Sequence, residues 1–163
     1  MLKIYVAGKW KERKQVMKIM EMFEARGHLI TCDWTKHTLP ENIELDRAHK
    51  EKSFVKDYDW AQNGHKTYAQ EDLEGVRNCE VLVAYMPDPE ILYKGAWIEI
   101  GIALGLDKKV IIIGKDVTTV FLSLPNITVV SYKEEAISII NSLQFDREYE
   151  EGAKYKDTDH FVM

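Results

Sequence analysis

Glu99 is the one charged residue in the apolar run GAWIEIGIALGL, residues 95–106. If this run is a helix, the neighbours of Glu99 on its own face include Ala96, Ile102 and Ala103, all of them apolar. A helical glutamate usually lies on a solvated face. A carboxylate among apolar side chains either loses hydration, at a cost on the order of several kcal/mol, or lies at the floor of a pocket that uses it. The pattern favours a reactive carboxylate over the alternative, a salt-bridged or partly exposed helical residue.

Tyr5 and Asp72 are the two other side chains that could act together with Glu99. Tyr5 lies in the N-terminal apolar run LKIYVAG, where strand alternation could aim its hydroxyl at the end of the sheet. Asp72 lies in YAQEDLEGVRN, between Glu71 and Glu74. The residues alone leave simpler alternatives open: an ordinary strand aromatic for Tyr5 and a solvated acidic helix face for Asp72.

Side chains that could bind a substrate follow the first two apolar runs. Gly8 ends the first run, and Trp10 and Arg13 open the helix after it, where backbone N–H groups and the helix dipole favour an anion. The alternative there is a solvated first turn. Trp34 follows the second run and could enclose a planar base together with Trp60, although core packing is the commoner fate of tryptophan.

Several common types of site are excluded by the motifs. The turn AGKWKER is neither a G-x-G-x-x-G nor a Walker A loop, and the chain holds no G-x-S-x-G or H-E-x-x-H motif. Cys32 and Cys79 form no CxxC pattern, so we expect two reduced, partly buried thiols. The histidines show no ligand spacing and are expected at the surface: His28, His37, His49, His65 and His160. We therefore expect no metal and no cofactor.

Apolar runs and helical periodicity divide the chain into alternating strands and helices. Strands are expected at residues 2–8, 28–32, 80–85, 109–113 and 127–130. Helices are expected at 11–26, with Gly27 as its C-cap, and at 65–78, 95–106 and 134–143. Residues 35–64 are polar and lack periodicity, and a connection of that length in a compact domain is usually functional.

This order predicts one α/β domain over residues 1–145, with residues 146–163 as an acidic C-terminal tail. Near-continuous apolar strands favour a five-stranded parallel sheet with helices on both faces, in a flavodoxin-like or Rossmann-like order. Ligands bind such sheets at the carboxyl ends of the strands. Here those ends are Ala7–Gly8, Asp33–Trp34, Tyr85–Met86 and Gly114.

The composition bounds the partners and the compartment. A net charge of −5 over 163 residues argues against general binding to nucleic acid or to anionic membranes, because both need a basic field. No secretory signal pattern is present at the N-terminus, and no charge-free apolar stretch approaches the length of a membrane span. We expect a cytoplasmic protein that acts on a small molecule.

Three stretches of the chain together resemble the nucleoside 2-deoxyribosyltransferase family, whose relatives include nucleoside-monophosphate N-glycosidases. They are the strand IYVAG with its tyrosine, the segment DLEG ahead of a V-x-V strand, and the stretch GAWIEIGIALGLDKKV. The stretches occur in the family's order, and the resemblance covers roughly residues 3–34 and 65–115.

The resemblance implies roles for the candidate residues. Glu99 would be the nucleophile, Tyr5 would orient its carboxylate, and Asp72 would contact the sugar hydroxyls and assist proton movement at the base. Six residues before Glu99, some transferases carry an Asp that helps to read the base and some monophosphate hydrolases carry a Ser near the phosphate, whereas this chain has Tyr93. Tyr93 and Gly95 are expected to line the substrate. The family also implies a homo-oligomer, since its members complete their sites across subunits.

The reaction that follows is cleavage of the N-glycosidic bond of a (2′-deoxy)nucleoside or nucleoside monophosphate. The base leaves through an oxocarbenium-like transition state, and a carboxylate on the opposite face of the sugar can trap that charge covalently. Attack by water makes a hydrolase, and attack by a second base makes a transferase. Lys9, Lys11 and Arg13 favour a phosphate on the substrate. The alternatives are a non-catalytic nucleotide-sensing module on the same fold and cleavage of a larger N-glycoside, such as a nicotinamide dinucleotide.

Overall fold

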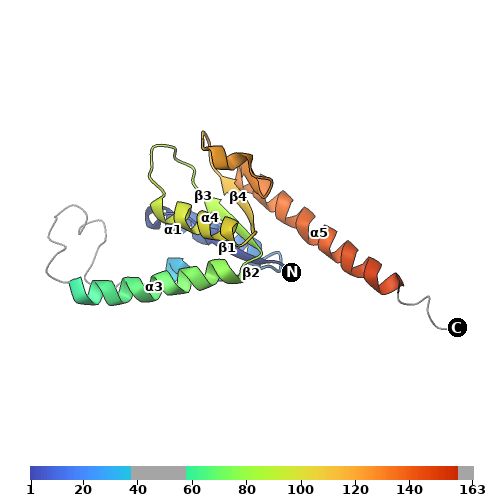
Figure 1. The fold of residues 1–163 in the computed structure, drawn as a ribbon, viewed down its shortest axis with the longest axis horizontal. Coiled ribbons are helices and arrows are strands. Elements are labelled where there is room, and N and C mark those ends of the chain that lie inside the picture. Colours follow the sequence, from blue (N-terminus) through green and yellow to red (C-terminus); the bar gives the residue numbers. More distant parts are fainter. Residues whose placement is uncertain (38–57, 158–163) are drawn as a thin grey trace.

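Five parallel strands form one sheet in the order β2-β1-β3-β4-β5 in the computed structural model, which describes residues 1–37 and 58–157 (Figure 1). The strands are β1 (Lys3–Ala7), β2 (Leu29–Ile30), β3 (Val81–Tyr85), β4 (Lys109–Ile113) and β5 (Ile127–Val130). This is the flavodoxin-like order, in which ligands bind where the strand order reverses, between β1 and β3. The predicted five-stranded parallel α/β sheet is confirmed.

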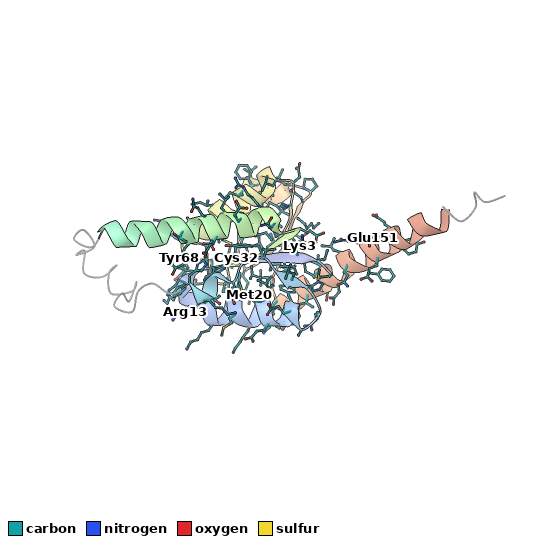
Figure 2. The ribbon with its side chains drawn as sticks, turned by 90° about the horizontal axis from the view of Figure 1, so that it is seen from below. Lys3, Arg13, Met20, Cys32, Tyr68 and Glu151 are labelled. Carbon is teal, nitrogen blue, oxygen red and sulfur yellow. The ribbon has the colours of Figure 1, made fainter. Side chains whose placement is uncertain are left out.

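Helices cover both faces of this sheet, as predicted. Figure 2 shows α1 (Arg13–Glu24) on one side and α3 (Tyr58–Asn78) on the other. Next to α3, α4 (Lys94–Gly105) packs over β1 and β3, while α5 (Lys133–Asp157) packs on β4 and β5. Across residues 1–37 and 58–157, no helix has both the length and the apolar character that are needed to cross a bilayer.

The inner strands owe their positions to continuous apolar sequence. In β3 and β4 almost every residue of VLVAY and KVIII is buried, because a parallel sheet with helices on both faces offers no solvated side. At the sheet edge, β2 is two residues long rather than the predicted five. Its backbone leaves the ladder after Thr31, whose N–H donates to the Ile4 carbonyl at 2.9 Å, and turns into the 3₁₀ helix η2 (Trp34–Lys36).

The first helix buries the face that its periodicity predicts, which consists of Val16, Ile19, Met20 and Phe23. A 3₁₀ turn, η1 (Trp10–Glu12), precedes it, so α1 begins two residues later than predicted. Gly27 lies beyond its end with φ +80°, and its N–H donates to the Glu24 carbonyl at 2.9 Å. Glycine is suited to this left-handed conformation, which confirms its predicted place at the end of the helix.

Two helices are longer than their apolar patterns predict. Helix α3 begins at Tyr58, so the end of the segment predicted as irregular is helical, while residues 38–57 lie outside the described part of the chain. Helix α5 runs on past residue 143 to Asp157. Its polar half is held by pairs four residues apart, such as Arg147 with Glu151, and Arg147 also donates to Glu80 at 2.6 Å. The domain boundary at residue 145 stays a prediction.

His28 is buried at the start of β2, where the sequence predicts a surface residue. Only 5% of it is exposed, its Nδ1 accepts a hydrogen bond from the Leu2 N–H at 3.3 Å, and its ring meets Phe23 edge-on. Burial lowers the pKa of His28, so the neutral ring is the form that fits here. The surface prediction was wrong because a lone histidine can fill a core position once one of its ring nitrogens has a backbone partner.

Candidate active site

The hydroxyl of Tyr5 donates a hydrogen bond of 2.8 Å to Glu99 Oε1. Tyr5 has no exposed surface and rises from the middle of β1, while Glu99 faces it from α4. Helix α4 lies on the sheet through Ala96, Ile100 and Ala103, which are small or aliphatic, and this close packing carries the carboxylate down to the strand. The structure therefore brings two of the three predicted reactive side chains into direct contact.

Burial controls the charge of Glu99. Loss of hydration raises the pKa of Glu99 to about 7; the hydrogen bond from Tyr5 opposes that rise, and the nearby Asp72 charge adds to it. The same burial, together with the two carboxylates, raises the pKa of Tyr5 well above its usual range, so the tyrosine stays a hydrogen-bond donor. A carboxylate with a pKa near neutrality can change its protonation state under working conditions, which is typical of groups that react.

Asp72 reaches the same centre from α3. Burial is the main cause that raises the pKa of Asp72, and its charge acts on both Tyr5 and Glu99. The helix can approach because of Gly75, one turn further along. A β-carbon there would lie 2.5 Å from the Cys32 β-carbon and 2.9 Å from the Tyr5 ring. The glycine of DLEG thus lets α3 pack directly on the tyrosine that holds Glu99.

Two residues lie beside Asp72 although the sequence analysis did not connect them with it. The Cys32 thiol donates to Asp72 Oδ1 at 3.6 Å, and His37 Nδ1 lies 3.9 Å from the same oxygen. The other ring nitrogen of His37 contacts Glu71 Oε2 at 2.9 Å, and the ring stacks on Tyr68. His37 is thus packed against α3 rather than lying free on the surface. No motif signals this cluster, because its members come from the residues on either side of η2 and from α3.

The residues predicted to bind substrate near the first turn have protein partners of their own. Gly8 permits close packing, since a β-carbon would lie 2.7 Å from Val16. Trp34 is buried, and its indole N–H donates to a β1 carbonyl at 2.6 Å, so the core-packing alternative describes it. Trp10 is partly exposed beside it, with the Arg13 guanidinium 4.7 Å from the centre of its ring. The side chain of Trp60 lies outside the described residues.

Tyr93 joins the loop before α4 to the turn before α1. It is 4% exposed, its hydroxyl donates to Glu12 Oε1 at 2.9 Å, and it accepts a hydrogen bond from the Asp88 N–H at 3.2 Å. Burial raises the pKa of Glu12. The second carboxylate oxygen of Glu12 is buried and has no hydrogen-bond partner within the described residues. Gly95, by contrast, has open space around its α-carbon. A direct role for Tyr93 or Gly95 at the substrate stays a prediction.

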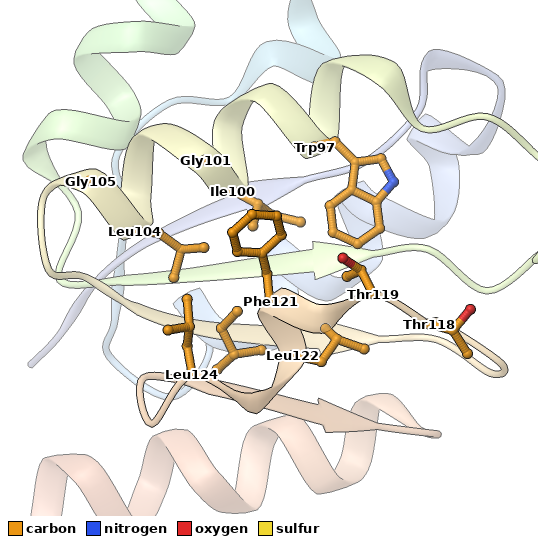
Figure 3. Close-up of a pocket in the computed structure, with 11 residues that line it drawn as sticks. Trp97, Ile100, Gly101, Leu104, Gly105, Thr118, Thr119, Phe121, Leu122 and Leu124 are labelled. Atoms are coloured by element: carbon orange, nitrogen blue, oxygen red, sulfur yellow. The ribbon is translucent and has the colours of Figure 1, made fainter.

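Two of the hollows lie near α3 and α4. One of about 380 Å³ lies between α3 and the segment around η2, where Cys32, His37 and Gly75 line it. A larger one, about 700 Å³, lies between α4 and the 3₁₀ helix η3 (Val120–Ser123) and is lined mainly by apolar side chains, including Trp97 and Phe121 (Figure 3). Neither hollow is lined by Tyr5, Asp72 or Glu99, so hollow size does not locate the candidate site.

The arrangement of Tyr5, Asp72 and Glu99 has a definite chemical capacity. Two carboxyl groups with raised pKa values interact with one hydroxyl donor, which is hydrogen-bonded to Glu99. Such a pair can divide its roles, one group acting ionised as a nucleophile and the other moving a proton. Across residues 1–37 and 58–157, one group of cysteine, histidine and carboxylate side chains has the spacing to hold a metal ion, and it consists of Cys32, His37 and Asp72.

Comparison with known proteins gives a family and two similar folds. The family model for nucleoside 2-deoxyribosyltransferase matches residues 4–159. A 2-deoxyribosyltransferase from the psychrotolerant bacterium Bacillus psychrosaccharolyticus aligns at 14% identity with a TM-score of 0.51, over 82% of this chain and 89% of that one. The Clostridium botulinum CMP N-glycosidase BcmB aligns at 16% identity with a TM-score of 0.47, over 85% and 98%. No curated protein sequence matches significantly.

The family match includes all three predicted reactive residues. It includes β1 with Tyr5, the part of α3 with Asp72, and α4 with Glu99. The solved 2-deoxyribosyltransferase from Bacillus psychrosaccharolyticus agrees on the fold at low identity. The chain belongs to the nucleoside 2-deoxyribosyltransferase family.

Proposed function

We propose that this protein cleaves the N-glycosidic bond of a (2′-deoxy)nucleoside or nucleoside monophosphate, with Glu99 as the nucleophile. The observation that carries the proposal is the partly buried Glu99 carboxylate, oriented by the Tyr5 hydroxyl at 2.8 Å beside a second carboxyl group. Ionised Glu99 attacks C1′ as the base departs, which gives a glycosyl–Glu99 ester. The sugar then passes to water or to another base.

We assign the proton transfer of this reaction to Asp72. Burial raises the pKa of Asp72 above its usual range, and the charge of Asp72 couples to that of Glu99. A protonated Asp72 can contact the sugar hydroxyls and deliver a proton towards the leaving base. When it has lost that proton, it can accept one from the incoming water or base. Tyr5 keeps the nucleophile in place throughout.

A panel of nucleosides and nucleotides, assayed by chromatography of the released bases, tests this activity. We expect release of a free base from at least one substrate, and an added acceptor base separates transferase from hydrolase. Glu99→Gln should lose the activity, while Glu90→Gln, an exposed control ahead of α4, should keep it. Ligand-induced thermal stabilisation without turnover on the whole panel would favour the sensing module instead.

The covalent step has its own test. A nucleoside whose sugar carries an electronegative 2′-fluoro group slows both steps, and the ester forms faster than it breaks when the leaving base is good. The mass of the intact protein should then rise by one glycosyl group, and peptide mapping should place it at Glu99. Base release at full rate without any adduct would argue for direct attack by water.

We also propose that the protein is a homo-oligomer that associates through the outer face of α4. On this face Ile98 is 65% exposed and Trp97 37% exposed. A β-carbon added at Gly101 or at Gly105 would meet no atom within 4 Å. The apolar side chains of η3 adjoin this face across the large hollow (Figure 3). Glycines four residues apart let two identical helices approach closely, so a second copy of the chain is the occupant that fits.

A further inference from the structure

We propose that Cys32, His37 and Asp72 form a site for a thiophilic divalent cation, best matched by Zn²⁺, and that occupancy of this site withdraws Asp72 from the reaction. One ligand atom from each residue lies within 4.8 Å of the other two. Cys32 Sγ is 3.6 Å and His37 Nδ1 3.9 Å from Asp72 Oδ1. The metal-binding part stands on this geometry, and the inhibitory part rests on the proposed function.

The three ligand types and their separations suit zinc. Zn²⁺ takes sulfur, imidazole nitrogen and carboxylate oxygen in a tetrahedral arrangement, at bond lengths that place neighbouring ligand atoms about 3.6 Å apart. The two separations from Asp72 Oδ1 are already close to this value. A fourth position can open into the hollow of about 380 Å³ that Cys32 and His37 line, where water can complete the coordination.

The surroundings of His37 are those of a metal ligand. Glu71 Oε2 lies 2.9 Å from His37 Nε2, so this nitrogen donates to the Glu71 carboxylate and Nδ1 is the nitrogen that faces Asp72. The ring of Tyr68 stacks on the imidazole at 4.2 Å between centroids and fixes its plane. Metal-bound histidines usually have such a carboxylate on the remote nitrogen, which sets the tautomer and strengthens the ligand.

The charge and proton balance also favour a dication. Zn²⁺ displaces the proton of the Cys32 thiol, which leaves to solvent, and a Zn–S bond replaces the S–H bond. One thiolate, one carboxylate and a neutral imidazole then cancel the charge of the ion. Glu71, Glu74 and Asp33 add negative potential around the hollow, and Lys36, which pairs with Asp33 at 2.8 Å, offsets part of it.

Direct binding measurements test the site. Chelator-treated protein is titrated with Zn²⁺ against a chelating dye, and with Co²⁺ while the thiolate-to-cobalt absorption is followed. We expect one ion per chain, and at least tenfold weaker binding in Cys32→Ser and in His37→Gln. Cys79→Ala is the matched control, because Cys79 is the other thiol and lies buried away from Asp72. Equal affinity in Cys32→Ser, or no cobalt–thiolate band in wild type, overturns the site.

Inhibition is measured separately on base release. Zn²⁺ should inhibit the wild type and Cys79→Ala at the concentration that fills the site, a chelator should restore the rate, and Cys32→Ser should need at least tenfold more metal. If Zn²⁺ fills the site without inhibiting base release, the proposal that the metal withdraws Asp72 from the reaction is wrong. If no substrate is turned over at all, the binding titration still decides the metal site, so the two proposals fail separately. Circular dichroism confirms that each variant is folded.

Discussion

The Tyr5 hydroxyl and the Glu99 carboxylate, 94 positions apart in the chain, meet in a hydrogen bond of 2.8 Å. The bond crosses from a central strand to the helix that covers it. It is the donor that offsets part of the cost of burying Glu99, because desolvation alone would raise the pKa of the carboxyl group further. The two residues therefore act as one unit, so a substitution of either one should also change the properties of the other.

Tyr5→Phe should lower kcat/KM by about ten- to hundredfold, because an oriented donor at a reacting carboxylate contributes on that scale. Loss of the donor also raises the pKa of Glu99 above about 7, so the limb of the pH profile on which activity increases should move to higher pH. Kinetics across pH measure both effects. Tyr132→Phe, an exposed tyrosine, is the control and should leave rate and profile unchanged. An unshifted profile with a reduced rate would contradict the electrostatic role of Tyr5.

Glu99→Gln should stabilise the fold at alkaline pH. The folded-state pKa of about 7 lies above the ordinary value of 4.5, so the ionised carboxylate opposes folding. This cost is absent below the unfolded-state pKa, grows as pH rises, and is complete above the folded-state pKa, where it reaches at most about 3 kcal/mol. Glutamine has no such titration. Denaturant unfolding should show a gain at a pH of about 8.5 that disappears near about 4.5; a gain independent of pH would contradict the argument.

Gly75→Ala should destabilise the protein by about 1–3 kcal/mol, because the added methyl group meets the Cys32 β-carbon and the Tyr5 ring. The activity should fall with the stability, since α3 must shift and carries Asp72 with it. Thermal unfolding and base release measure the two effects. Gly152→Ala is the matched control: it lies in an open part of α5 and should be neutral or stabilising. Equal behaviour of both variants would show that α3 does not depend on close contact with Tyr5.

Arg13→Ala should discriminate between nucleoside monophosphates and nucleosides. If Arg13 leaves Trp10 to bind a phosphate, its loss should raise KM for monophosphates about tenfold or more, as expected for a charged hydrogen bond, and leave nucleosides unaffected. Lys14→Ala changes the next exposed cation on α1 and serves as control. An equal loss on both substrate classes would assign Arg13 to the support of Trp10 alone.

Ile98→Glu should dissociate the proposed oligomer. It puts a charge into the apolar outer face of α4, one residue before Glu99. Light scattering after size exclusion should show a smaller species, whereas Met17→Glu, on a partly exposed position of α1, should keep the wild-type mass. A wild type that is already monomeric would refute the oligomer directly. Activity measured alongside shows whether the reaction needs the assembly.

The pattern of apolar strands was enough to predict most of the fold from the sequence. The apolar surroundings of Glu99 indicated the centre of the candidate site. Buried parallel strands and the amphipathic α1 leave strong periodic signals. The second half of α5 leaves none, because its stability comes from polar pairs such as Arg147 with Glu151. His37 was missed for a different reason. Its partners belong to another segment, and no spacing within one stretch of sequence encodes such a contact.

Trp34 and Tyr93 illustrate a further limit of sequence reasoning. Both are large aromatic residues with a polar atom, a type that serves binding sites and protein cores alike. In the fold, each directs its polar atom to the protein: Trp34 to a carbonyl of β1, and Tyr93 to Glu12. Residue type alone could not decide between these uses, because the choice depends on which backbone or carboxylate oxygen lies within reach.

The course of α5 separates the outer turns of this helix from the candidate active site. Arg147 binds Glu80, at the start of β3, and lies 3.4 Å from the Met1 carbonyl, so the helix crosses the amino ends of the strands (Figure 1). Beyond this point it extends away from the sheet. A tether attached along its outer turns would therefore leave the opposite rim accessible to small molecules. Immobilisation on a solid support through this helix is a practical use of its geometry.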